Sequence, residues 1–319
     1  MSPRLHSFEA ILSRVRDHPE RCVGIPGAEE HSVLEAVLEA RRRALCRFIL
    51  FGDERRLREI LEKEIDGGEA LLADDGVIVE PVDDPAKGIA AVTAMAVTGD
   101  VDIILKGRIP TPHLLRTVLR EGRLRTGWLL SDVMVFEDPV VRDEDPATSR
   151  LMCVTDGGVN ILPSLEEKRQ IIMNAVSLFH SLGFDEPRVA CLSASEIVTD
   201  KLPSTLDADR LKQWNASGHL TGCVVDGPLA IDLAISIKSV HEKGFQSAIA
   251  GDADILLVPN IESGNILGKL VTYYGHAPVG HTIIGSRVPI LIPSRSDDML
   301  TKLNSIALGI LAGAREEVG

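Results

Sequence analysis

The chain has 319 residues, and its 34 Lys and Arg against 47 Asp and Glu give a formal net charge of −13. Apolar residues make up 45% and charged residues 25%, the ordinary balance of a soluble globular protein with one large or two medium domains, so disorder is excluded as the dominant state. The acidic surplus also argues against a nucleic-acid partner, because binding a phosphate backbone needs a basic face.

Short apolar runs alternate with amphipathic segments through the first half of the chain. Strands are expected at 22–25, 48–51, 77–79 and 101–105, and helices at 33–45, 54–65, 85–98 and 112–119. Asp53 is predicted to cap the helix that begins at residue 54.

The second half repeats this alternation. Strands are expected at 129–136, 151–155, 189–192, 224–225, 254–258, 282–284 and 290–292, and helices at 165–182, 206–216, 261–274 and 297–311. Ser164 is predicted to cap the longest of these helices. With only 3% aromatic residues to fill a core, the pattern predicts an α/β fold with mainly parallel strands and helices on both faces.

The polar, proline-bearing stretch 137–149 is the best candidate for a domain break, and the final helix is free to return to the first domain. The N-terminal 20 residues are amphipathic and charged, without the apolar core of a signal peptide, and no apolar run is long enough for a membrane helix. The expected location is therefore the cytoplasm.

Metal and disulfide chemistry find no support in the sequence. Five cysteines lie far apart without CxxC spacing, which predicts reduced core residues: Cys22, Cys46, Cys153, Cys191 and Cys223. The nine histidines form no HxH or HxxxH pair, so no metal site is expected. No dinucleotide fingerprint, Walker A sequence or GxSxG is present.

Several polar motifs follow predicted strands, at the positions where open α/β sheets bind ligands. Lys106, Gly107 and Arg108 come directly after one strand, and Thr111 precedes the next helix. Two cations, a glycine and a helix N-terminus suit an anion, although a solvated turn explains the same residues.

A second motif is the run 155–160, in which Asp156 and Asn160 flank two glycines. These side chains either orient a ligand or simply hydrogen-bond their own tight turn. Asp226 follows a third strand. A fourth strand is followed by four polar residues at the start of a helix, more than a helix cap needs: Asn260, Glu262, Ser263 and Asn265.

The last motif, residues 293–298, lies between the final strand and the final helix. Arg295 offers a planar fork for phosphate or carboxylate, and Ser294 offers a hydroxyl donor. Asp297 or Asp298 either accepts a proton or caps the helix.

Together these blocks resemble the phosphate acetyl/butyryltransferase family. The resemblance is carried, in order along the chain, by residues 101–137, 154–176, 202–208, 224–236 and 252–309. It implies two α/β domains of the isocitrate/isopropylmalate dehydrogenase type with a cleft between them. The first domain would comprise residues 1–147 with 278–319, and the second, residues 148–277, would form a homodimer.

The resemblance implies the reversible reaction acyl-CoA + phosphate ⇌ acyl phosphate + CoA on a short acyl group, butyryl or acetyl, by direct transfer in a ternary complex. The resemblance implies no metal and no cofactor; coenzyme A would take part as a substrate. The implied catalytic residues are Ser294, Arg295, Asp297 and Asp298. The implied substrate-binding residues are Lys106, Gly107, Thr111, Asp156, Asn160, Asp226, Asn260, Glu262 and Asn265.

Two other hypotheses remain open at this stage. A related acyltransferase would take its acyl group from acyl carrier protein. A non-catalytic homologue would bind acyl-CoA or another metabolite, although the Ser294–Arg295 pair argues against it.

Overall fold

The computed structural model describes residues 3–139 and 150–313. They form two compact units. The first unit is built from the described parts of Phe8–Trp128 and Gly280–Gly319, and the second from those of Met1–Ser7 and Leu129–Val279. The expected break at 147 lies outside the described residues. Residues 129–139 were expected in the first domain but belong to the second unit, because their strand pairs there.

The first unit contains a mostly parallel sheet with the strand order β3-β2-β1-β4-β11-β10. Its strands are β1 (Arg21–Pro26), β2 (Cys46–Gly52), β3 (Val77–Pro81), β4 (Ile103–Leu105), β10 (Val279–Ile284) and β11 (Ile290–Leu291). Neighbouring strands are parallel except β10 and β11, which are antiparallel.

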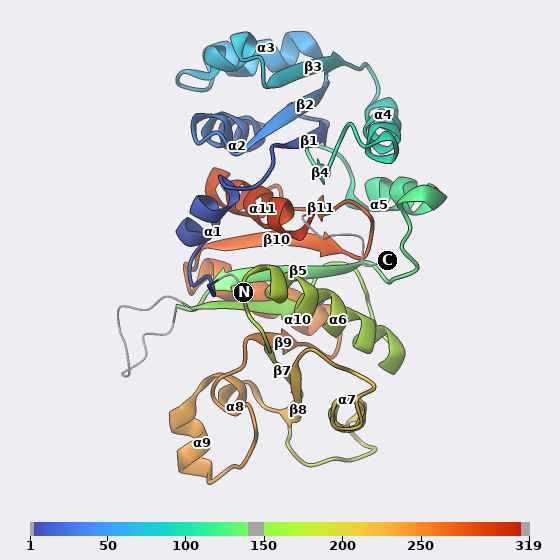
Figure 1. The fold of residues 1–319 in the computed structure, drawn as a ribbon, viewed down its shortest axis with the longest axis vertical. Coiled ribbons are helices and arrows are strands. Elements are labelled where there is room, and N and C mark those ends of the chain that lie inside the picture. The colour runs from blue at the N-terminus through green and yellow to red at the C-terminus, as the bar shows by residue number, and fades with distance from the viewer. Residues whose placement is uncertain (1–2, 140–149, 314–319) are drawn as a thin grey trace. The chain divides into compact units, whose positions relative to one another are not determined.

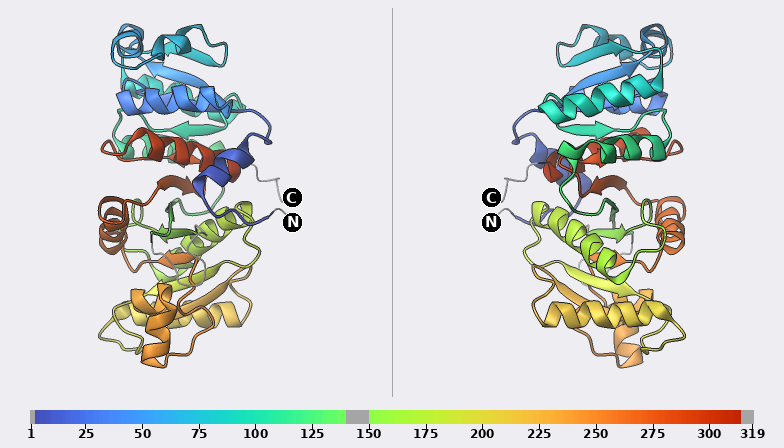
Figure 2. Two further views of the ribbon diagram at one scale, coloured as in Figure 1. Left: turned by 90° about the vertical axis from the view of Figure 1, so that its left-hand side faces the viewer. Right: turned by 90° about the vertical axis from the view of Figure 1, so that its right-hand side faces the viewer.

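Helices cover both faces of this sheet. They are α1 (Phe8–Val15), α2 (His31–Arg42), α3 (Glu54–Lys63), α4 (Pro85–Thr98), α5 (Thr111–Arg120) and α11 (Met299–Ala312), with 3₁₀ helices η1 (Gly68–Ala73) and η2 (Gly122–Leu124). Helix α11 packs against α1 and α2 on one face, and α4 contacts α5 on the other (Figures 1 and 2). Helix α1 was not expected from the sequence.

Two predicted helix caps can be compared with the structure of the first unit. Asp53 caps α3 as expected, because its Oδ1 accepts the Arg56 N–H at 3.0 Å. The predicted start of the last helix at Asp297 is wrong. Asp298 is the N-cap, its Oδ1 accepting the Thr301 N–H at 2.8 Å, and the helix begins at Met299.

The strands of the second unit are ordered β5-β6-β9-β7-β8, with both parallel and antiparallel pairs. These strands are β5 (Ser131–Glu137), β6 (Leu151–Thr155), β7 (Arg188–Leu192), β8 (Val224–Leu229) and β9 (Ile255–Leu257). Only β5 and β6 run antiparallel to each other. Strand β8 continues to Leu229, beyond the expected residues 224–225. Pro228 is tolerated in it because β8 is an edge strand, where a residue without an N–H need not break a hydrogen bond to a neighbouring strand.

The helices of the second unit are α6 (Leu165–Ser181), α7 (Pro203–Ala216), α8 (Ile231–Ile235), α9 (Ile237–Lys243) and α10 (Ile261–Tyr273). Ser164 caps α6 as predicted, in a capping box with Glu167. Figure 2 shows α6 and α10 on opposite sides of the strands of this unit. The short helices α8 and α9 were not expected.

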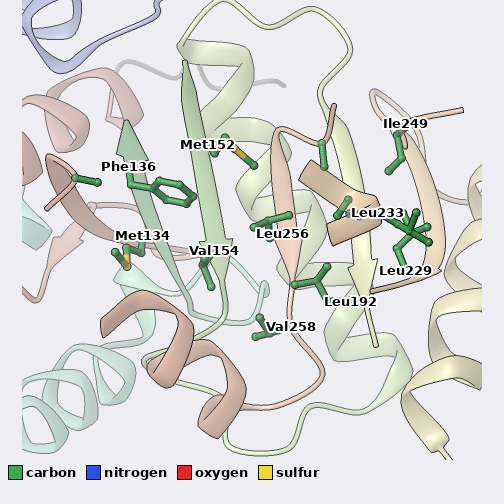
Figure 3. Packing of buried hydrophobic residues seen from close by; sticks show 14 of the residues in the cluster. Met134, Phe136, Met152, Val154, Leu192, Leu229, Leu233, Ile249, Leu256 and Val258 are labelled. Atoms are coloured by element: carbon green, nitrogen blue, oxygen red, sulfur yellow. The ribbon is translucent and has the colours of Figure 1, made fainter. Parts of the chain in front are cut away.

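An aliphatic core holds the strands of the second unit together (Figure 3). Met152 and Val154 of β6 pack beside Leu256 of β9, and Phe136 of β5 is the one aromatic ring among the fully buried members. The low aromatic content therefore predicted the kind of core correctly. Among the described residues, no helix is long and apolar enough to cross a membrane.

Candidate active site

The site in the first unit is built from three loops that follow parallel strands. Strands β1, β4 and β11 are neighbours and run parallel, so the segments after them emerge at one edge of the sheet. These segments carry Glu30, Lys106 and the Ser294–Arg295 pair, respectively. The topology thus brings together residues that lie up to 265 positions apart in the sequence.

The loop after β4 touches the loop after β1 through main-chain atoms. The Gly107 N–H donates to the Pro26 carbonyl at 3.2 Å, and the Arg108 N–H donates to the Gly27 carbonyl at 2.6 Å. A Cβ on Gly107 would lie 2.0 Å from the Gly27 oxygen. Glycine is therefore required here by a neighbouring backbone, whatever the ligand.

We expect the substitution Gly107→Ala to destabilise the protein by at least about 2 kcal/mol, because a backbone carbonyl has little freedom to move aside. Urea unfolding followed by circular dichroism measures this. Gly122→Ala is the matched control, since a Cβ on Gly122 meets nothing within 4 Å. Equal stability of the two variants would contradict the steric argument.

The Ser294–Arg295 pair lies in a tight turn closed by Asp297. The Ser294 N–H donates to Asp297 Oδ2 at 2.7 Å, and the Asp297 N–H donates to the Ser294 carbonyl at 3.1 Å. The hydroxyls of Ser294 and Ser296 are 3.1 Å apart. Arg295 is exposed at the tip of this turn, while Asp297 is buried.

Lys106 is only 5% exposed and interacts electrostatically with four charged residues of this unit. Burial lowers its pKa, the nearby cations Arg295 and Lys302 lower it further, and Glu30 and Asp297 act in the opposite direction. Of the two cations in the motif after β4, Lys106 is buried and Arg108 is exposed. Glu30 and Lys302, which the sequence did not indicate, also lie near Lys106.

A signal for Lys302 was present in the sequence. It is the single charged residue of α11, MLTKLNSIALGILA, in which every residue from Thr301 to Ala312 is buried. Glu30 carried no comparable signal, because Glu29 and Glu30 together are typical of the polar start of a helix. Thr111, also expected in the site, is the first residue of α5 and is half-buried.

In the second unit, Asp156 organises the turn after β6. Its carboxylate accepts the N–H groups of Gly158 at 2.8 Å, Val159 at 2.9 Å and Asn160 at 3.2 Å, and the Asn160 side-chain amide at 2.6 Å. Burial first, and then the charge of Asp132, raise the pKa of Asp156 to about 6. These contacts are those of a tight turn that binds its own aspartate, and a role toward substrate stays a prediction.

The N-terminus of α10 packs directly on this turn. Asn260 caps the helix by accepting the Ser263 N–H at 3.0 Å and the Ser263 hydroxyl at 2.6 Å. A Cβ on Gly264 would lie 2.7 Å from the Gly157 Cα, so the two backbones are in contact. The exposed Asn265 therefore lies close to the Asp156 turn.

Asp226 of the second unit has its own set of hydrogen-bond and ion-pair partners. Lys212 Nζ lies 2.6 Å from its Oδ1, the Gly227 N–H donates to the same oxygen at 2.8 Å, and the Ser247 hydroxyl donates to Oδ2. Burial alone would raise the pKa of Asp226, but these donors outweigh it and the pKa lies below its ordinary value. Glu262 is exposed in the first turn of α10.

The described residues offer neither an accessible thiol nor a group of metal ligands. All five cysteines are buried, and burial raises the pKa of Cys223 to about 12, so its thiol stays protonated and is no nucleophile near neutral pH. Within residues 3–139 and 150–313, no three His, Cys, Asp or Glu side chains gather as metal ligands would.

The comparison with known proteins identifies the class. The family described as "Phosphate acetyl/butaryl transferase" matches residues 7–310, and the chain belongs to this family. It is 37% identical over 313 residues to the phosphate butyryltransferase of Clostridium beijerinckii, covering 98% of this chain and 99% of that one. It is 35% identical over 303 residues to the phosphate acetyltransferase of Thermotoga maritima, covering 94% and 98%.

Two solved structures superpose on this chain and share its fold. A branched-chain phosphotransacylase from Enterococcus faecalis superposes with a TM-score of 0.78 at 30% identity, covering 93% of this chain and all of that one. The 4-hydroxythreonine-4-phosphate dehydrogenase of Klebsiella pneumoniae, with a TM-score of 0.50 at 16% identity over 92% of this chain and all of that one, shares the fold alone. The predicted α/β, dehydrogenase-like fold class is confirmed.

Proposed function

We propose that this protein transfers a short-chain acyl group between coenzyme A and phosphate, with butyryl preferred to acetyl. The observation that carries the proposal is a buried lysine beside an exposed arginine at one sheet edge, in a chain that matches this family over residues 7–310. The preference for butyryl rests on the phosphate butyryltransferases among its relatives and on the short turn after Arg295.

In the proposed reaction, a phosphate oxygen attacks the thioester carbonyl carbon. The new C–O bond forms as the C–S bond breaks, the electron pair leaves on sulfur, and the proton of hydrogen phosphate ends on the CoA thiol. Arg295 and Lys106 would offset the charge of phosphate, and the Ser294 hydroxyl would stabilise the developing oxyanion. Holding both substrates together supplies proximity, and a thiolate is a good leaving group near neutral pH.

In this proposal the two aspartates of the turn have a structural role. Asp297 and Asp298 each accept a backbone N–H, which shapes the turn and the start of α11. Thr111 and Gly107 would border the phosphate or the acyl group. The residues of the second unit expected to bind substrate stay predictions: Asp156, Asn160, Asp226, Asn260, Glu262 and Asn265.

The test gives the purified protein acetyl-, propionyl- or butyryl-CoA with phosphate and follows thiol release, with acyl-loaded acyl carrier protein as a parallel donor. We expect release that requires phosphate and is fastest with butyryl-CoA, and intersecting double-reciprocal plots, as a ternary complex gives. Parallel plots would indicate an acyl-enzyme. No release from any acyl-CoA would overturn the proposal, and release from the carrier protein alone would favour the related acyltransferase.

We also propose that the protein acts in the cytoplasm as a homodimer formed through its second domain. The five free, buried cysteines support the location, because thiols stay reduced in that compartment. Light scattering behind a sizing column measures the mass in solution, and a monomer near 34.5 kDa would contradict the dimer.

A further inference from the structure

Lys302 is a buried cation that the proposed reaction does not use. Its side chain is 1% exposed, on a helix that is otherwise uncharged. Burying an ammonium group is costly unless it is paired and hydrogen-bonded. Lys302 is both, since its Nζ donates to the Asp297 carbonyl at 2.6 Å and lies 3.3 Å from Glu30 Oε1.

These two contacts join two loops of the site. Asp297 closes the turn that carries Ser294 and Arg295, so a bond to its carbonyl supports that turn from the core side. Glu30 lies just before α2, in the segment that follows β1. Lys302 therefore fixes the segment after β11 against the segment after β1.

We propose that Lys302 is a positioning residue for phosphate, which holds the Ser294–Arg295 turn in place by donating to the Asp297 carbonyl and by pairing with Glu30. The inference rests on the proposed function, because it takes phosphate as the anion bound at this edge. It assigns Lys302 no contact with the substrate.

The test compares Lys302→Met with the double variant Glu30→Gln/Lys302→Met. Inorganic phosphate is titrated into each protein by calorimetry, and KM and kcat are measured with butyryl-CoA. We expect Lys302→Met to weaken phosphate binding and raise the phosphate KM at least tenfold, with the butyryl-CoA KM changed less than threefold. The double variant should recover the unfolding midpoint, because no unpaired carboxylate remains. It should keep the loss of phosphate affinity, because the Asp297 carbonyl still lacks the Lys302 donor.

Lys168→Met is the matched control. Lys168 is also buried, 5% exposed, and pairs with Asp207 at 2.5 Å in the second unit, so this variant also removes a buried lysine from an ion pair. We expect it to lower the unfolding midpoint with phosphate affinity changed less than threefold.

A merely structural role would be shown if the double variant regained phosphate affinity together with stability, and this result would overturn the inference. An unchanged phosphate affinity in Lys302→Met, or a wild type that binds no phosphate, would overturn it as well. A wild type that binds phosphate but transfers no acyl group would refute the proposed function only. The phosphate affinities of the variants relative to the wild type would then still decide the role of Lys302.

Discussion

Replacing Arg295 with alanine is expected to raise the phosphate KM at least tenfold and to lower kcat/KM for phosphate about a thousandfold. The guanidinium would make charge-assisted, paired hydrogen bonds to phosphate that strengthen as charge develops in the transition state. Arg295 is exposed on its turn, so its removal creates no cavity and should leave the unfolding midpoint unchanged. Initial rates over a range of phosphate concentrations measure the effect.

Two further variants sharpen this prediction. Arg295→Lys keeps the charge but loses the planar fork, so it should recover part of the rate and little of the phosphate affinity. Arg120→Ala removes an exposed arginine at the end of α5 and should change neither parameter more than twofold. An unchanged phosphate dependence in Arg295→Ala would remove Arg295 from the site.

Replacing Asp156 with alanine is expected to destabilise the protein by about 4 kcal/mol. The substitution leaves three backbone N–H groups and the Asn160 amide without their acceptor in a mostly buried turn, and each lost partner costs about 1 kcal/mol or more. Urea unfolding measures the loss. Asp209→Ala, on the exposed side of α7, is the control and should change stability by less than about 0.5 kcal/mol.

The ionisation of Asp156 adds a pH dependence of known sign. Its pKa is about 6 in the folded protein against an ordinary value of 3.8, so the folded state binds more protons between these values. The stabilising contribution of this group is present below pH 3.8 and is lost as the pH rises through 6, a change of about 3 kcal/mol in total.

Asp156→Asn isolates this contribution, because the amide keeps the size of the side chain and does not titrate. The free energy of unfolding of the wild type minus that of the variant should fall by about 2 kcal/mol from pH 4 to pH 7. A difference that stays constant, or that rises with pH, would show that Asp156 has no raised pKa.

The net charge of −13 is compatible with the anionic substrates that we propose. Overall charge governs solubility and long-range steering, whereas the charged groups around a site set the local field. At the carboxyl edge of the first unit, Arg295 and Lys302 lie near Lys106. The acidic composition therefore argues against nucleic acid without excluding a phosphate site.

The sequence by itself determined the fold class and most elements of both units. Buried parallel strands appear as short apolar runs, and apolar residues recur every three to four positions in amphipathic helices. The alternation of strands and helices could therefore be recognised from local sequence. Strong caps at Asp53 and Ser164 were equally local signals, because capping depends on residues only three positions apart. The short helices α8 and α9 gave too little periodicity to be expected.

Only the tertiary structure decided which polar residues act together. Sequence spacing left Asp297 and Asp298 both open as the helix cap, and the structure decides between them: the Asp297 carboxylate closes the Ser294 turn and Asp298 caps the helix. Glu30 and Lys302 lie 272 positions apart and meet because parallel strand order places their segments at one edge of the sheet. Strand order depends on long-range packing and leaves no local pattern. The sequence therefore named Lys106, Arg295 and Asp297, and only the fold showed that Glu30 and Lys302 lie with them.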